Sequence, residues 1–144
     1  MNVAFLFLHP FSESPGSSIR VDKLARSLGS LGVDCTIFTP YENYQEISNN
    51  VRINPISALA SHGHISSSAY KLSKRIYYSK LLKWNLSMYI KANQIMAKRL
   101  AFSIHQKLVK GHMDLLQVEQ DITIAAGLEL KKLTGIPVVA DIHN

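Results

Sequence analysis

Apolar runs and helical spacings of apolar residues alternate along much of the chain. Residues 3–8 form an uninterrupted apolar run, which is typical of a strand buried on both faces. Pro10 ends this strand, because proline has no N–H group to donate to a neighbouring strand. After a polar loop over residues 11–18, apolar residues recur at helical spacing, and residues 33–39 read as a second strand that Pro40 ends. The pattern predicts a strand, a loop, a helix and a parallel second strand.

The loop before this helix is rich in small residues and follows a strand of a parallel sheet. Open α/β folds bind ligands at the carboxyl ends of such strands. Ser17 or Ser18 is placed to cap the helix, and Gly32 is placed to end it. The backbone N–H groups of Gly16, Ser17 and Ser18 suit a phosphate or a sugar hydroxyl, although a simple turn would use the same residues. A nicotinamide cofactor is disfavoured, since the motif G-x-G-x-x-G is absent.

Three more strands are expected further along. Residues 51–56 read as a strand that Pro55 makes either a sheet edge or a frayed end, and residues 114–119 and 136–140 form two later strands. The five strands alternate with helices, so the predicted fold class is α/β, a Rossmann-like doubly wound parallel sheet ordered 3-2-1-4-5. One domain covering residues 1–144 is expected.

The remaining helices follow from apolar spacing and from helix-ending residues. Helical character dominates residues 69–110, with a break expected near residues 83–85 and an end at Gly111. Asp121 can cap the last helix, and Gly135 can end it.

Composition indicates the cellular compartment of the protein. The chain has 144 residues, 47% of them hydrophobic, and a single cysteine, Cys35, within an expected strand. Cys35 is therefore expected to be a buried small hydrophobic residue in a reducing compartment. The first apolar run lacks a basic leader and is too short to span a bilayer, so we expect a cytoplasmic protein. No bound metal is expected.

Basic residues are concentrated in the middle of the chain. No acidic residue lies between Glu46 and Asp114, while eleven of the sixteen lysines and arginines of the chain fall there. These eleven are Arg52, Lys71, Lys74, Arg75, Lys80, Lys83, Lys91, Lys98, Arg99, Lys107 and Lys110.

Two of these lysines share one face of the long expected helix. Lys91 and Lys98 lie opposite its apolar stripe, and Ile95 and Phe102 flank them. A basic face with large apolar groups suits an anionic membrane surface, so Lys80, Lys91 and Lys98 are candidates for contact with the inner face of a membrane. An ordinary solvated helix face fits the same pattern. Nucleic acid is disfavoured as a partner, since no stacking module or helix-turn-helix signature accompanies the charge.

Three segments together resemble a known family. They are HPFSESPGSSIRVDKLARSLGSLGVDCTIFTP, DLLQVEQD and GIPVVADIHN. They look like the N-terminal half of glycosyltransferase family 4, whose members have the GT-B fold. The resemblance implies two Rossmann-like domains, of which the missing C-terminal domain holds most of the nucleoside-diphosphate sugar. It further implies an acceptor-binding role for this chain in sugar transfer, with retention and without a bound metal. The resemblance does not identify the acceptor, which could be linked to a lipid.

Candidate roles follow for individual residues. The backbone amides of Gly16 and Ser17 are expected to stabilise the departing diphosphate. By the resemblance, His143 lines the reaction centre and hydrogen-bonds the transferred sugar, unless it is only a terminal residue. Glu119 is expected to orient an acceptor hydroxyl, or else to pair with a basic neighbour. His9, at the mouth of the first strand, is a weaker candidate.

Two other function classes stay open. A free-standing Rossmann-like domain that binds a small ligand or regulates another protein would bind its ligand without a second domain. A basic interaction module would bind nucleic acid and lose that binding when Lys91 and Lys98 are changed to glutamate.

Overall fold

The computed structural model describes residues 1–8, 15–39, 50–56, 86–119 and 121–142. In the first turns of the three helices, side chains are described only from residue 19, with gaps from residue 87, and from residue 122 onward. The predicted break near residues 83–85 lies outside this part of the chain. None of the described helices is long and apolar enough to cross a membrane.

The described strands form one parallel sheet in the order β3-β2-β1-β4-β5. The strands are β1 (Asn2–Leu6), β2 (Asp34–Thr39), β3 (Val51–Pro55), β4 (Leu115–Glu119) and β5 (Val138–Asp141). The predicted strand order and the edge position of the strand that contains Pro55 are confirmed.

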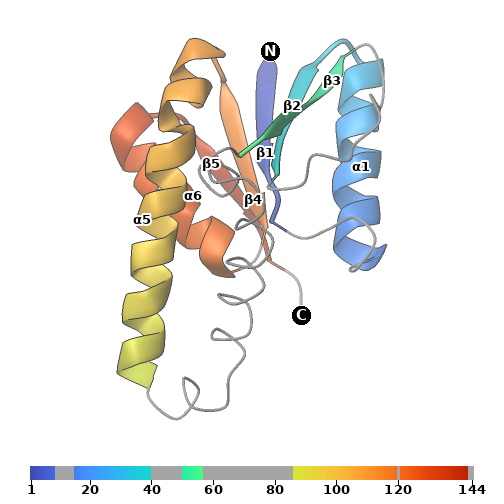
Figure 1. Ribbon diagram of the computed structural model, residues 1–144. Helices are drawn as coiled ribbons and strands as arrows, with labels where there is room; N and C mark the ends of the chain where they lie inside the picture. Colours follow the sequence, from blue (N-terminus) through green and yellow to red (C-terminus); the bar gives the residue numbers. More distant parts are fainter. Residues whose placement is uncertain (9–14, 40–49, 57–85, 120, 143–144) are drawn as a thin grey trace.

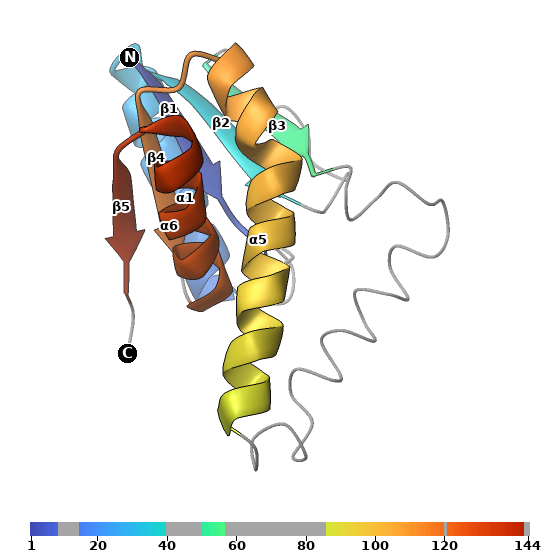
Figure 2. The same ribbon diagram turned by 90° about the vertical axis from the view of Figure 1, so that its left-hand side faces the viewer.

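Helices cover both faces of the sheet. Figures 1 and 2 show α1 (Pro15–Ser30) on one face, and α5 (Leu86–Lys110) and α6 (Asp121–Thr134) on the other. The predicted doubly wound α/β architecture is therefore confirmed.

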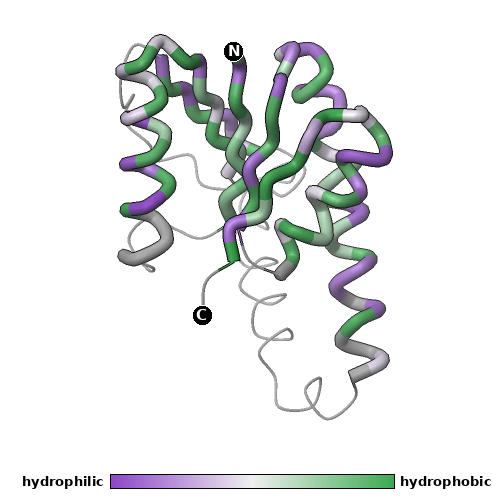
Figure 3. The backbone as a smooth tube through the Cα atoms, turned by 180° about the vertical axis from the view of Figure 1, so that it is seen from behind, coloured by the Kyte–Doolittle hydropathy of each residue, from purple (hydrophilic) through white to green (hydrophobic). Residues whose placement is uncertain are grey.

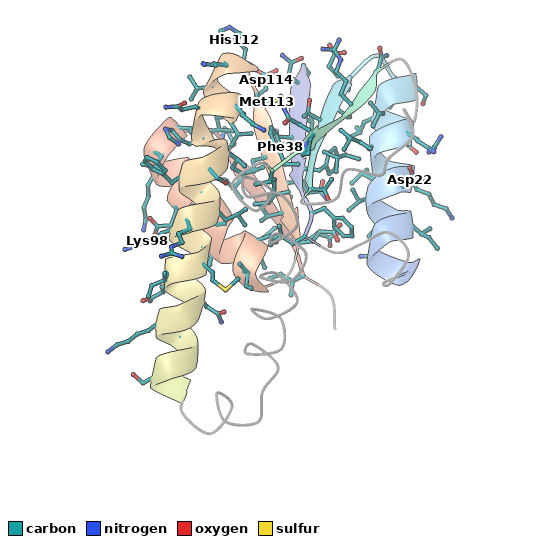
Figure 4. The ribbon with its side chains drawn as sticks, viewed as in Figure 1. Asp22, Phe38, Lys98, His112, Met113 and Asp114 are labelled. Carbon is teal, nitrogen blue, oxygen red and sulfur yellow. The ribbon has the colours of Figure 1, made fainter. Side chains whose placement is uncertain are left out.

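Residue alternation along the strands supplies two hydrophobic cores. In β1, Val3 and Phe5 belong to the core on the α1 side, whereas Ala4 and Leu6 belong to the core on the side of α5 and α6. All four are buried, as expected for a central strand of a parallel sheet. Phe38 of β2 joins the α5 side, and Figure 4 shows it inside the molecule. In Figure 3, green hydrophobic segments run along the strands.

The helix ends correct some predictions and confirm others. Helix α1 begins at Pro15, so Ser17 and Ser18 lie in its first turn and not at the cap position. Proline suits that first position because the N–H group that it lacks would have no helical partner there. Gly32 and Gly135 follow α1 and α6 with φ of 81° and 75°, as their predicted roles require.

Helix α5 ends at Lys110, next to Gly111, as predicted. The left-handed residue after it is His112, with φ of 47°, and not the glycine. The strand that follows starts at Leu115, one residue later than predicted, and Asp114 instead accepts a hydrogen bond from the backbone N–H of Asn2 at 2.7 Å. Figure 4 shows His112, Met113 and Asp114 together at this end of the molecule.

Candidate functional site at the carboxyl edge of the sheet

The carboxyl ends of the five strands lie at one edge of the sheet, because all of them are parallel. Helix α1 starts at the same edge, the lower one in Figure 1. The backbone of Gly16, Ser17 and Ser18 lies in the first turn of α1. The first N–H groups of a helix have no partner within the helix, so this turn presents donors toward the edge.

Glu119 is the last residue of β4 and is only 4% exposed. Leu116 and Val118 point to the core on the α5 side, so alternation places Glu119 on the opposite face, the one covered by α1. Neither carboxylate oxygen of Glu119 has a hydrogen-bond partner among the described residues. A buried carboxyl group without a partner is unfavourable in its charged form, which makes this position unusual for a purely structural residue.

Two further ionisable residues lie beside Glu119. Asp141 is its register partner on the neighbouring strand β5, so the two side chains share one face of the sheet. Arg20, from the second turn of α1, places its Nη1 atom 3.5 Å from Oδ2 of Asp141. This ion pair joins the start of α1 to the end of β5, and so brings two distant parts of the sequence to one edge.

These surroundings set the protonation of Glu119. Burial, and after it the negative charge of Asp141, raise the pKa of its carboxyl from the ordinary value of 4.5. The positive charge of Arg20 opposes both effects, and the resulting pKa is about 7. A carboxyl with a pKa near neutrality is divided between its two forms, so it can both accept and return a proton at the pH of the cell.

The hydroxyl of Thr123 in α6 donates a hydrogen bond to the backbone carbonyl oxygen of Glu119. This contact fixes the end of β4 against α6 and leaves the Glu119 side chain uninvolved. The alternative that Glu119 is neutralised by a hydrogen-bonded basic neighbour is not seen among the described residues.

The other predicted site residues divide into two groups. His9, His143 and Lys80 lie outside the described residues, so their roles stay predictions. Lys91 and Lys98 are exposed on α5, a helix on the opposite face of the sheet from α1. The structure therefore gathers Glu119 and the start of α1 at one edge, and it keeps the two α5 lysines apart from them.

Sequence reasoning missed Arg20 and Asp141 as site residues. Asp141 ends the last strand, and the same rule that selected Glu119 could have selected it. Arg20 gave no such signal, because a single arginine in an amphipathic helix is usually a surface residue. Among the described residues, no three His, Cys, Asp or Glu side chains gather in a way that could hold a metal ion.

Neither a family model nor a curated protein sequence matches this chain. A solved structure of a sucrose-phosphate synthase from Thermosynechococcus elongatus does match, with a TM-score of 0.61 at 13% identity. The match covers 100% of this chain and 64% of that chain. The likeness shows a Rossmann-like fold shared with a GT-B glycosyltransferase; at this identity it does not show membership of family 4, which stays a prediction.

Proposed function

We propose that this chain is the acceptor-binding N-terminal domain of a family 4 glycosyltransferase that transfers a sugar from a nucleoside-diphosphate sugar to an acceptor hydroxyl. The observation that carries the proposal is Glu119, a buried carboxyl without a partner at the edge where α/β sheets bind ligands. The shared fold makes sugar transfer the favoured reaction for this carboxyl.

Glu119 orients the acceptor in this proposal. Its carboxylate accepts a hydrogen bond from the attacking hydroxyl and holds the hydroxyl oxygen close to the anomeric carbon. As the new C–O bond forms, the bond to the diphosphate breaks, and the diphosphate leaves with the bonding electron pair. A pKa of about 7 lets the carboxylate take the hydroxyl proton and release it afterwards. Asp141 and Arg20 tune this pKa in opposite directions.

The start of α1 has a separate role in the proposal. The departing diphosphate carries negative charge, and the N-terminal end of a helix offers both free N–H groups and a partial positive charge. Gly16 and Ser17 lie in this turn. The same edge therefore provides donors for the leaving group and, at Glu119, an acceptor for the attacking hydroxyl.

A second domain completes the enzyme in this proposal. The match spans only 64% of the sucrose-phosphate synthase chain. We therefore expect the donor nucleotide to bind to a C-terminal domain encoded after this one, with His143 near the junction. This chain alone is expected to fold without catalysing transfer.

The proposal is tested with the product of the whole gene. Acceptor-dependent release of nucleoside diphosphate would be measured for a panel of nucleotide sugars, with Glu119→Gln and the matched control Glu129→Gln. Glu129 makes an exposed ion pair with Lys132 on α6, away from the edge. We expect Glu119→Gln to lower kcat about a hundredfold or more and the control to leave it unchanged. Full activity of Glu119→Gln would remove Glu119 from the mechanism.

A free-standing ligand-binding domain is the second candidate, because the site at Glu119 and α1 lies within this chain. It predicts that the chain alone binds small sugars or sugar phosphates tightly. Calorimetric titration of the chain alone with such compounds separates the two candidates. Tight binding, in a gene that encodes no second domain, would favour the binding protein over the transferase.

A further inference from the structure

The outward face of α5 carries large apolar side chains that the fold leaves in solvent. Ile95, Phe102 and Val109 are 56%, 72% and 53% exposed. They are spaced seven residues apart, close to two helical turns, so they form one row along the helix. We call this row, with Lys91 and Lys98 beside it, the outer face of α5. Exposed apolar residues in a continuous row need a partner more than scattered ones do.

The opposite side of α5 packs against the sheet. Leu100, Ile104 and Leu108 are buried in the core between α5 and the sheet. The outer face is therefore not the core-facing stripe of this helix, and its apolar residues are additional to those that the fold requires. The rings of Phe102 and His105 lie 5.1 Å apart, centroid to centroid, so Phe102 has a neighbour on its own helix.

The charge on this helix has one sign. Helix α5 contains five lysines and arginines and no acidic residue. Lys91 and Lys98 are also seven residues apart and follow the apolar row, and Figure 4 shows Lys98 on the side of α5 away from the sheet. Lys107 differs from them, because it turns toward β3 and donates hydrogen bonds to Asn54 and Pro55. The outer face thus pairs apolar groups with positive charge that no acidic side chain of the described residues neutralises.

Charge and shape discriminate among the surfaces that could cover this face. A second copy of the helix would bring lysines of like charge against one another, which is unfavourable. Nucleic acid would match the charge, but phosphates give exposed Phe102 and Ile95 nothing to bury against. An anionic bilayer satisfies both features, since apolar side chains enter the boundary of the acyl chains while lysines reach the headgroups.

We propose that the outer face of α5 binds the surface of a bilayer that contains anionic lipids. Ile95, Phe102 and Val109 enter the interface, and Lys91 and Lys98 bind the headgroup phosphates. Helix α5 would then lie along the membrane with its opposite side holding the sheet. The proposal does not depend on sugar transfer, and it holds or fails whether or not Glu119 is catalytic.

The test is flotation of the purified chain with vesicles of phosphatidylcholine alone and of phosphatidylcholine mixed with phosphatidylglycerol. We expect binding only to the mixed vesicles, and we expect added salt to weaken it, because ions screen the lysines. The double variant Lys91→Glu/Lys98→Glu should bind at least about tenfold more weakly. Phe102→Ser should also weaken binding, with far less dependence on salt.

Matched controls come from α6, which also has exposed residues of both kinds. Lys131→Glu/Lys132→Glu makes the same change of charge, and Leu133→Ser removes an apolar side chain that is 57% exposed. Both controls should float like the unchanged chain. All variants alter exposed positions, so their circular dichroism and unfolding midpoints should match that of the parent.

Five results would overturn the proposal. Equal binding to both kinds of vesicle, or no binding to either, would exclude an anionic membrane. Equal losses for the α5 variants and the α6 controls would show that only net charge matters. A dimer in light scattering that Phe102→Ser dissociates, or duplex binding that outcompetes the vesicles, would assign the face to another partner.

Discussion

The middle of β4 and its carboxyl end bury their side chains to a similar degree, with opposite effects on stability. Leu116 and Val118 are fully buried among apolar neighbours of α5 and α6. Glu119, the next residue, is 4% exposed and has no described hydrogen-bond partner for its carboxylate oxygens. Burial of Leu116 and Val118 stabilises the fold, whereas burial of the charged Glu119 opposes folding. A strand that ends in such a residue is suited to binding at that end.

The largest effect is expected in the middle of the strand. Leu116→Ala removes apolar atoms from a closely packed core and should lower the free energy of unfolding by about 3 kcal/mol. Denaturant titration measures this value. Leu128→Ala, at a position 55% exposed on α6, is the control and should change stability by less than about 0.5 kcal/mol. Equal losses from both variants would mean that β4 is not at the core of the fold.

At the end of the same strand, replacement of Glu119 by glutamine should raise the free energy of unfolding, whereas Leu116→Ala lowers it. The pKa of Glu119 is raised from 4.5 to about 7 in the folded state, so the folded chain binds more protons than the unfolded chain between these values. Stability should therefore fall as pH rises through this window, by up to about 3 kcal/mol. Glu119→Gln cannot ionise and should be more stable than the parent by about 2 kcal/mol at a pH of about 8.

The free energies of unfolding of the parent and of Glu119→Gln need to be compared at two pH values. At a pH of about 4, the parent carboxyl is mostly protonated in both states, and the two stabilities should nearly converge. Denaturant titrations at both pH values measure the difference directly. A constant difference at the two pH values would show that Glu119 does not titrate as described.

The same contrast explains what sequence reasoning could reach. The apolar run at residues 3–8 predicted the first strand, because burial on both faces leaves a clear pattern. The alternation of strands with helices predicted the parallel sheet and its strand order. Glu119 could be selected because an acidic residue at the end of an apolar strand breaks that pattern. The pairing of Arg20 with Asp141 could not be predicted from the sequence, since it depends on how α1 lies across the sheet. The start of α1 was predicted three or four residues too late, because Ser17 and Ser18 are favoured cap residues, whereas the helix begins at Pro15.

Close packing of α6 on the middle of the sheet gives a smaller effect. A Cβ atom at Gly127 would lie 2.9 Å from Cγ1 of Val118 and 3.1 Å from Cγ1 of Val138. Gly127→Ala gains helix propensity but forces these strands away, so we expect a net loss of about 1 kcal/mol. Thermal unfolding measures it. A stabilised variant would show that α6 can move off β4 and β5 without cost.

The smallest change in stability is expected for Arg20→Met. Its ion pair with Asp141 is half-exposed, and such pairs contribute about 0 to 1 kcal/mol. Its effect on Glu119 should be clearer, because among the described residues the positive charge of Arg20 is what lowers the Glu119 pKa. The Glu119 carboxyl of the variant should therefore titrate at a higher pH than that of the parent. The pH dependence of the free energy of unfolding measures this shift. An unchanged profile would mean that Arg20 does not act on Glu119.

Direct titration of the Glu119 side chain tests the central claim. Carbon-13 NMR of the carboxyl group, assigned by comparison with Glu119→Gln, reports its protonation across the pH range. The account predicts a midpoint of about 7, well above the ordinary value of 4.5. A midpoint near 4.5 would show a solvated carboxylate with no special role, and would contradict the site at this edge of the sheet.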